Sequence, residues 1–212
     1  MPAPLAEHAR KGRVVGTQGL HRRPGALRAR VPLAAPDRWP LTVKTALAPL
    51  DAVAPDAVEA LLDRAFPPGR HARTAYKVRG SVKPIAELCF AAMEGDTLIG
   101  SIQCWPVALT DDQGHSHGLV MVGPVAVEPD HQQGGIGREL LGHMLEVAAA
   151  KGLDRALMLI GDPEYYGRFF GFTADRTADW RLPGPVERHR LLARGPDVPA
   201  LAGMLGPDPT AG

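Results

Sequence analysis

A glycine-rich loop between a strand-like segment and an amphipathic helix constrains the fold of this chain more than any other feature. Residues 119–127 are apolar throughout, the loop carries Gly134, Gly135 and Gly137, and an apolar stripe starts at Leu140. Glycine lets the backbone turn tightly, so several N–H groups at a helix N-terminus point toward one anion, which the helix dipole also favours. The sequence therefore predicts a phosphate cradle between a strand and a helix.

The residues after the loop predict a βαβ unit. A helix with one apolar face ends at the basic residue Lys151 and a capping glycine, Gly152, and the apolar run 156–160 follows as a strand. Strand, glycine turn, helix and strand in this order indicate two parallel strands. In the first strand, Gly123-Pro124 predicts a bulge or a local parting of strands, because proline cannot donate to a ladder. The residues of the apolar helix face are Leu140, Leu141, Met144, Leu145 and Ala148.

Further elements are predicted on both sides of this unit. A helix is expected over residues 51–66, capped by Asp51 or Asp56, because apolar residues recur at helical spacing. The basic stretch 70–82 is interpreted as a helix or loop that borders a site. The remaining expected elements are a first strand at 41–43, antiparallel strands within 180–194 and a short turn over 199–205.

A hairpin is expected where two apolar runs, 88–92 and 98–106, flank a short glycine-containing turn. With a two-residue turn, Cys89 would face Ile102, and Cys104 would lie one diagonal step away, beyond easy disulfide reach. These are the only two cysteines of the sequence, and they form no CxxC metal motif. They are interpreted as reduced, buried thiols.

Composition indicates a globular protein outside the membrane. The 212 residues are 45% hydrophobic and 22% charged, and no run approaches the ~20 apolar residues of a membrane span. The N-terminus lacks the apolar core of a secretory signal, so a cytoplasmic location is expected. Residues 1–40 hold eight Lys/Arg against Glu7 and Asp37 and are expected to form a basic, disordered arm. A targeting peptide or a nucleic-acid-binding tail are the functional alternatives for this arm.

Two motifs carry a resemblance to a known family. The loop contains neither the GxGxxG of dinucleotide-binding folds nor the GK[ST] of a P-loop. Instead it resembles the [QR]-x-x-G-x-[GA] signature of the GCN5-related N-acetyltransferase (GNAT) family, at Gln132, Gly135 and Gly137. Residues 159–172 resemble the second cofactor element of that family, a strand, a short helix and a Gly-Phe pair, and 61–75 resembles its first-helix region.

The resemblance implies an α/β fold with a mixed, mostly antiparallel central sheet of about six to seven strands, helices on both faces and a βαβ cofactor unit. The N-acetyltransferase domain is expected over residues 41–205, between the arm and a tail at 206–212. The implied cosubstrate is acetyl-CoA, with its pyrophosphate on the loop amides from Gln133 to Arg138 and its pantetheine arm along the first strand. The implied cofactor-binding residues are Val125, Ala126, Val127, Gln132, Gln133, Gly134, Gly135, Ile136, Gly137 and Arg138.

The resemblance also implies a tyrosine that protonates the leaving coenzyme A sulfur. The family usually has this tyrosine four residues before the glycine of the Gly-Phe pair, where this chain has Gly167. Tyr166 is the favoured candidate, because one inserted phenylalanine restores the spacing, and Tyr165 is the alternative. Both tyrosines are also interpretable as packing residues of the pantetheine pocket. Candidate bases for the amine, each also interpretable as a cap or a solvated charge, are Glu87, Glu128, Asp130 and Asp162.

The predicted function is transfer of an acetyl or short acyl group from coenzyme A to a primary amine by direct attack in a ternary complex. A non-catalytic acyl-CoA-binding regulatory module is the alternative, because the tyrosine is displaced from its usual position. The acceptor is expected to be a small-molecule or peptide amine, and a homodimer is possible. No metal is expected, since His115 and His117 are interpreted as polar loop residues, and the three tryptophans as core or rim residues.

Overall fold

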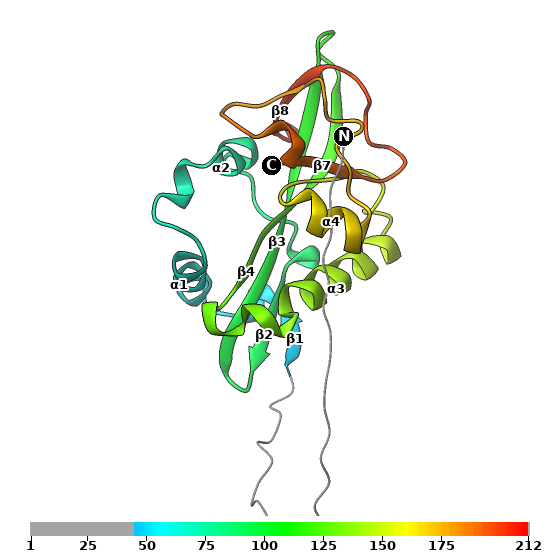
Figure 1. Ribbon diagram of the computed structural model, residues 1–212. Helices are drawn as coiled ribbons and strands as arrows, with labels where there is room; N and C mark the ends of the chain where they lie inside the picture. Colours follow the sequence, from blue (N-terminus) through cyan, green and yellow to red (C-terminus); the bar gives the residue numbers. More distant parts are fainter. Residues whose placement is uncertain (1–44, 212) are drawn as a thin grey trace, which may run out of the picture. The chain divides into compact units, whose positions relative to one another are not determined.

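The computed structural model describes residues 45–211, which lie within one compact unit of the chain, Thr42–Gly212. One mixed sheet of eight strands forms the centre of this described part (Figure 1). The basic arm expected over 1–40 and the strand expected at 41–43 lie outside the described residues. The strands are β1 (Ala46–Pro49), β2 (Phe90–Glu94), β3 (Thr97–Asp111), β4 (Ser116–Val127), β5 (Leu157–Ile160), β6 (Trp180–Arg181), β7 (Leu191–Arg194) and β8 (Gly203–Pro207).

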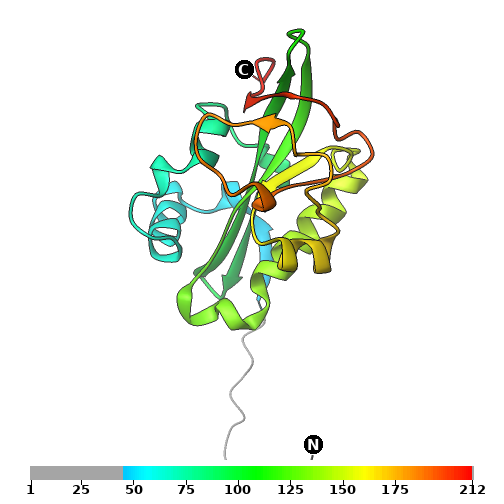
Figure 2. The ribbon, with the colours of Figure 1, turned by 45° about the horizontal axis from the view of Figure 1, so that its top comes forward.

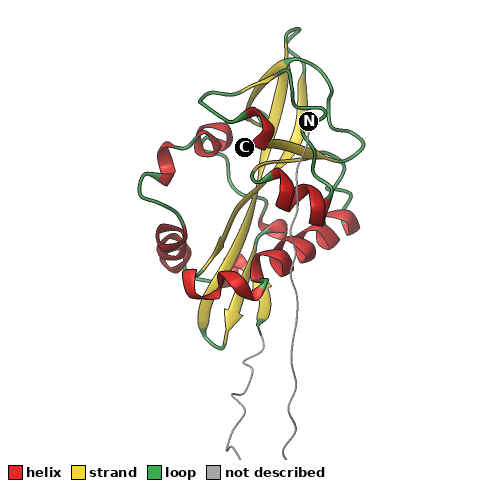
Figure 3. Cartoon of the chain, in the orientation of Figure 1, coloured by secondary structure: helices red, strands yellow, loops and turns green. Residues whose placement is uncertain are grey.

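Helices cover both faces of the sheet (Figure 3). The α-helices α1 (Pro55–Ala65) and α2 (Thr74–Arg79) pack on one face, and α3 (Ile136–Ala150) and α4 (Pro163–Phe170) on the other. This arrangement confirms the predicted fold class. No helix within residues 45–211 is long and apolar enough to cross a membrane. The short 3-10 helices are η1 (Leu50–Ala52), η2 (Arg70–Ala72), η3 (Ala86–Leu88), η4 (Pro129–Gly134) and η5 (Arg188–Arg190).

The main path of the sheet runs in the order β1-β2-β3-β4-β5-β7, and within it only β4 and β5 are parallel (Figure 2). The predicted βαβ unit is therefore confirmed. The turn predicted over 199–205 is wrong, because β8 begins at Gly203 and pairs antiparallel with β3. The prediction of antiparallel strands within 180–194 holds for β7, whereas β6 runs parallel to β8.

The hairpin register differs from the prediction by one residue. Gly95 and Asp96 form the expected two-residue turn, because Glu94 pairs with Thr97. A bulge between Ala92 and Met93 shifts the register beyond it, so Ile102 faces Phe90 instead of Cys89. The thiols remain free, and the Cys104 amide donates to Cys89 Sγ over 3.4 Å.

The helix predicted over 51–66 is shorter than expected. The structure has η1 first and then α1, which starts at Pro55 because proline suits the first helical position. Ala54 occupies the N-cap and no side chain caps the helix, so both predicted caps, Asp51 and Asp56, are wrong. α3 follows the prediction, with its apolar stripe on the sheet and Gly152 at φ 70° beyond its end.

Strands β4 and β5 separate soon after they meet. Only Val120 with Leu157 and Met121 with Met158 are paired between them, although β4 continues to Val127. At the same level β4 bulges against β3 around the cis Gly123-Pro124 peptide. Both outcomes predicted from this Gly-Pro step are confirmed, and the gap leaves one edge of 122–127 without a strand partner among the described residues.

Candidate functional site

The glycine loop leads from β4 into α3 through a tight turn. Residues of η4 precede Gly135, which sits at the N-cap of α3 with φ 79°, a conformation that favours glycine. The Gln132 side-chain amide donates to the Val127 carbonyl over 3.4 Å and ties the loop to the end of β4. The amides of Arg138 and Glu139 bond to the Gly135 carbonyl at 2.9 and 3.0 Å.

These bonds narrow the set of amides that can hold an anion. The first N–H groups of any α-helix lack intrahelical acceptors, and here they belong to Ile136 and Gly137. The Arg138 amide, which was also expected to hold the pyrophosphate, already donates to the Gly135 carbonyl in this structure. The helix dipole adds to the positive potential at this point.

A cavity of about 230 Å³ lies beside the loop and is called the loop cavity below. Four of the ten expected cofactor residues line it, together with both candidate tyrosines and residues of α1 and α3. The side chains from β4 belong to one face of the strand, as alternation requires. The predicted residues that line the loop cavity are Val125, Val127, Gln132, Gly137, Tyr165 and Tyr166.

The other expected cofactor residues lie elsewhere. Ala126 is buried on the opposite face of the sheet with α1, and Ile136 belongs to the core beneath α3. The Arg138 guanidinium lies 4.9 Å from the centroid of the Phe169 ring, at the exposed surface. Gln133 and Gly134 are exposed.

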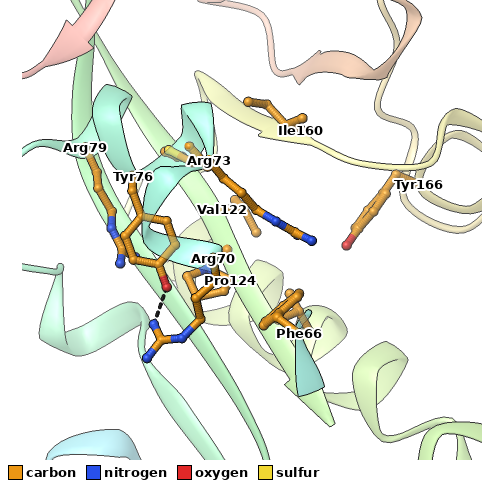
Figure 4. Close-up of a pocket in the computed structure, with 13 residues that line it drawn as sticks. Phe66, Arg70, Arg73, Tyr76, Arg79, Val122, Pro124, Ile160 and Tyr166 are labelled. Carbon is orange, nitrogen blue, oxygen red and sulfur yellow. Dashed lines mark hydrogen bonds between the residues drawn. The ribbon is translucent and has the colours of Figure 1, made fainter. Parts of the chain in front are cut away.

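A second cavity of about 140 Å³, called the central cavity, occupies the gap where β4 and β5 separate (Figure 4). It adjoins the loop cavity, since Phe66, Val125 and Tyr166 line both. The opposite wall comes from η2 and α2. The two cavities thus run along β4 from the glycine loop to the α2 side of the sheet.

Tyr166 is the predicted catalytic residue that borders both cavities. It lies half-buried on α4, and burial raises its pKa to about 12. Tyr165 borders the loop cavity alone, in edge contact with Tyr166, and burial raises its pKa while Arg138 opposes that shift. Tyr166, which the sequence favoured over Tyr165, is therefore the tyrosine beside the central cavity.

Gly161 gives Tyr166 its place, and sequence reasoning missed this residue. A Cβ atom at Gly161 would lie 2.3 Å from Cε2 of the Tyr166 ring. Asp162 follows and caps α4 by accepting from the Glu164 amide at 2.9 Å. The turn between β5 and α4 therefore positions the tyrosine by close packing.

Three arginines line the α2 side of the central cavity, within the basic stretch that was expected to border a site. Arg70 is 4% exposed and pairs with Glu59 and Asp63. Although burial lowers the pKa of Arg70, the hydrogen bonds that its guanidinium donates to these carboxylates raise the pKa above its ordinary value. Figure 4 shows Arg73 and Tyr166 pointing toward one another across the cavity. Apart from the basic composition of residues 70–82, nothing in the sequence predicts that Arg73 and Tyr166 face each other.

Arg79 is the third arginine, and its guanidinium is stacked between two rings. It lies 3.8 Å from the centroid of Tyr76 and 4.0 Å from that of Trp105, and the residue is 8% exposed. Burial lowers the pKa of Arg79. Trp105 is partly buried against the core and packs on the Arg79 guanidinium.

None of the four candidate bases lines the loop cavity or the central cavity. Glu128 is bonded to Arg64, with 2.9 Å between Oε1 and Nε, and Glu87 to Lys151 over 3.0 Å. Asp162 is the cap of α4, and Asp130 is exposed within η4. Asp162 and Asp130 thus match the interpretation as a cap and a solvated charge, whereas Glu87 and Glu128 are held in ion pairs.

His115 and His117 lie at the tip of the β3-β4 hairpin, away from both cavities. Their ring nitrogens contact the same oxygen of Asp111, at 3.2 and 3.1 Å. The contacts support the interpretation of this segment as a polar loop.

Comparison with known proteins gives a family and a fold. The model of the acetyltransferase (GNAT) family matches residues 56–172. The chain is similar to the GNAT family N-acetyltransferase YhbS from Escherichia coli in complex with CoA, with 22% identity, a TM-score of 0.61, and coverage of 81% of this chain and 93% of that one. It is also similar to a GNAT family acetyltransferase from Brucella melitensis in complex with acetyl-CoA, with 24% identity, a TM-score of 0.45, and coverage of 73% and 98%. The search of curated proteins found no match.

Proposed function

Because this chain belongs to the acetyltransferase (GNAT) family, whose model matches more than half of it, we propose that it transfers an acetyl or short acyl group from coenzyme A to a primary amine. The acceptor attacks the thioester directly while both substrates are bound. The observation that carries the proposal is the pair of adjoining cavities along β4, which Tyr166 borders on both sides.

The residues of the loop cavity fit coenzyme A. The first-turn amides of α3, Ile136 and Gly137, offer donors and a positive dipole to a pyrophosphate. The edge of β4 over 122–127, which β5 leaves open, offers backbone groups to the amides of the pantetheine arm. Val125 and Val127 supply an apolar wall for its methylene groups. Arg138 stands at the exposed rim, where a further phosphate group is expected.

The reaction needs one bond to form and one to break. The amine nitrogen adds to the thioester carbonyl carbon, and the carbonyl oxygen becomes an oxyanion. Collapse of this intermediate breaks the carbon–sulfur bond, the electron pair leaves with sulfur, and the nitrogen gives up a proton. The central cavity holds the two reacting groups next to each other, and this orientation lowers the entropic part of the barrier.

Tyr166 is proposed to donate a hydrogen bond to the departing sulfur. With its pKa at about 12, the phenol stays protonated at neutral pH. A thiol has a pKa near ~8.5, so full transfer of the tyrosine proton to the thiolate is uphill. The hydrogen bond therefore stabilises the developing negative charge, and the proton from the amine leaves through water.

This role needs no carboxylate base beside the amine. An acceptor that enters as the neutral amine already has its lone pair, and positioning supplies much of the rate. The cavity-lining residues support this view, since the four candidate carboxylates line neither cavity.

The proposal is tested with purified full-length protein, acetyl-CoA and a panel of primary amines. The measurements are thiol release and the mass of the acetylated product, with coenzyme A affinity measured separately by calorimetry. Amine-dependent thiol release with a product heavier by one acetyl group is the expected result. Tight coenzyme A binding without turnover on any amine would instead support a non-catalytic acyl-CoA-binding module.

A further inference from the structure

The buried guanidinium of Arg79 lacks a neutralising carboxylate. No Asp or Glu oxygen lies within 4.0 Å of it among residues 45–211, although the residue is only 8% exposed and lines the central cavity. The rings of Tyr76 and Trp105 stabilise the cation from two sides. Arg70, by contrast, has two carboxylate partners of its own. The Tyr76 hydroxyl and, from farther away, Glu59 favour the charge of Arg79. A buried charge without a direct ion pair is still costly, so an anion that enters the cavity gains a strong interaction here.

The charge of the cavity wall points in the same direction. Arg73 extends into the cavity opposite Tyr166, and neither Asp nor Glu occurs among the described residues that line it. A side cavity of about 460 Å³ shares Arg73, Ala75 and Ile160 with it. The acidic residue there, Glu187, is paired with Arg190 over 3.5 Å. A cationic acceptor would therefore meet repulsion on its way to Tyr166.

We infer that the acceptor is a small amine that also carries an oxyanion, a carboxylate or a phosphate, bound by Arg79 and Arg73 while the amine faces the acyl group. The inference rests on the proposed function and adds the chemical class of the acceptor. The central cavity measures about 140 Å³ and also receives the thioester. Because a cavity of about 150 Å³ holds a molecule only as large as benzene, an acceptor that binds here has to be small.

The phosphates of coenzyme A are a competing partner for these arginines. The amides expected to hold the pyrophosphate belong to Ile136 and Gly137, whereas Arg70, Arg73 and Arg79 line only the central cavity or the side cavity and not the loop cavity. The arginines thus lie on the acceptor side of Tyr166. If the arginines bind the phosphates of coenzyme A, their substitution lowers coenzyme A affinity. If they bind the anion of the acceptor, coenzyme A affinity is unchanged.

The experiment compares amines that differ only in the anion. The pairs are β-alanine with propylamine and phosphoethanolamine with ethanolamine, each assayed at saturating acetyl-CoA. Values of kcat/KM are calculated on the free-amine concentration, so that differences in the fraction of neutral amine do not enter. The anionic member of at least one pair is expected to be preferred about 10- to 100-fold, the range of a hydrogen bond to a charged group. Comparison of the two pairs tells carboxylate from phosphate.

Variants connect this preference to the arginines. Arg79→Met keeps an unbranched stem between the rings, and Arg73→Met alters an exposed residue that poses little risk to folding. Lys77→Met, an exposed residue of the same helix that does not line the central cavity, is the matched control. Arg79→Met is expected to reduce the anion preference about 10-fold or more, and Lys77→Met to leave it unchanged. A mere loss of packing would lower turnover of both members of a pair equally.

Each outcome decides the inference. Equal or better turnover of the neutral amines would overturn it while the proposed function stands. The same holds if Arg79→Met or Arg73→Met weakens coenzyme A binding while the anion preference persists. If acetyl-CoA binds but no amine of either kind is acetylated, the proposed function fails and the inference fails with it.

Discussion

At the scale of single residues, the two tyrosines of α4 separate into different positions. Tyr166 borders both the loop cavity and the central cavity, whereas Tyr165 borders the loop cavity alone. The rings meet edge to face with their centroids 5.1 Å apart, so they are neighbours with distinct exposures. A hydroxyl at Tyr166 can reach a group held between the cavities, and this supports its assignment to the leaving sulfur.

Tyr166→Phe is expected to lower kcat about 100-fold, the low end of general acid effects, because a thiolate leaves readily without help. The ring and its packing stay, so affinity for coenzyme A should hold. Tyr165→Phe is the matched control on the same helix turn and is expected to change kcat much less. Steady-state kinetics with varied acetyl-CoA provide the measurement. Equal effects of the two substitutions would contradict the assignment.

The pH dependence of the reaction follows from the raised pKa of Tyr166. Because the phenol keeps its proton until the pH nears 12, this group produces no falling limb in the working range. The rate is expected to rise with pH as the acceptor ammonium, whose pKa as a primary aliphatic amine is ~10, loses its proton, and to show no fall up to about pH 10. A profile of kcat/KM for the amine measures this. A decline between about pH 8 and 10 that disappears in Tyr166→Phe would show a tyrosine with a lowered pKa instead.

At the scale of elements, the connection from β5 to α4 determines where Tyr166 lies. Gly161 follows β5 directly, and its amide donates to the Arg190 carbonyl at 2.9 Å. The absence of a Cβ atom at this position lets the Tyr166 ring pack against the backbone. The catalytic candidate is thus held by a turn whose shape depends on one small residue.

Gly161→Ala is expected to displace the Tyr166 ring, lower kcat at least 10-fold and destabilise the fold by about 1–3 kcal/mol, the usual cost of overpacking. Gly142→Ala is the matched control, since a Cβ there has nothing within 4 Å and lies in the middle of α3. That control should raise stability by up to about 1 kcal/mol. Thermal denaturation and kinetics of both variants test the pair. Unchanged kcat in Gly161→Ala would refute the positioning role.

At the scale of the whole molecule, the sheet is completed by segments outside the family match. β6, β7 and β8 all follow residue 172, where the match ends, and the fully buried Trp180 of β6 packs in one cluster with residues of β7 and β8. The indole N–H donates to the Pro199 carbonyl at 3.2 Å. The hydrophobic cluster around Trp180 therefore depends on the C-terminal strands. The homodimer and a role for the arm over 1–40 stay predictions.

Deletion of residues 1–40 is expected to leave folding, coenzyme A affinity and amine acetylation within about 2-fold of the full-length protein, because both cavities are built from residues after 64. Circular dichroism, calorimetry and the acetylation assay compare the two proteins. A large loss of activity would assign the arm to the site. Salt-sensitive binding of nucleic acid that disappears on deletion would revive the nucleic-acid alternative.

The sequence by itself determined the parts of this protein that local patterns encode. The glycine turn at 134–137, the apolar stripe of α3 and the Gly123-Pro124 irregularity each depend on residues close together in the chain, so the βαβ unit and the gap beside β4 were predictable. Spacing to Gly171 also favoured Tyr166. Such local patterns indicate which conformation a segment prefers, and each of these segments adopts that conformation in the folded chain.

Only the tertiary structure decided how distant segments meet. The bulge at Ala92 shifted the hairpin register, and β8 at 203–207 paired with β3, because strand pairing depends on partners that no local pattern identifies. For the same reason, no local pattern could predict which residues form the acceptor side of the site. Arg79 from α2 stacks on Trp105 from β3 and lies far in sequence from Tyr166. Only the packing of the sheet between its two helical layers brings Arg79 and Tyr166 to one cavity.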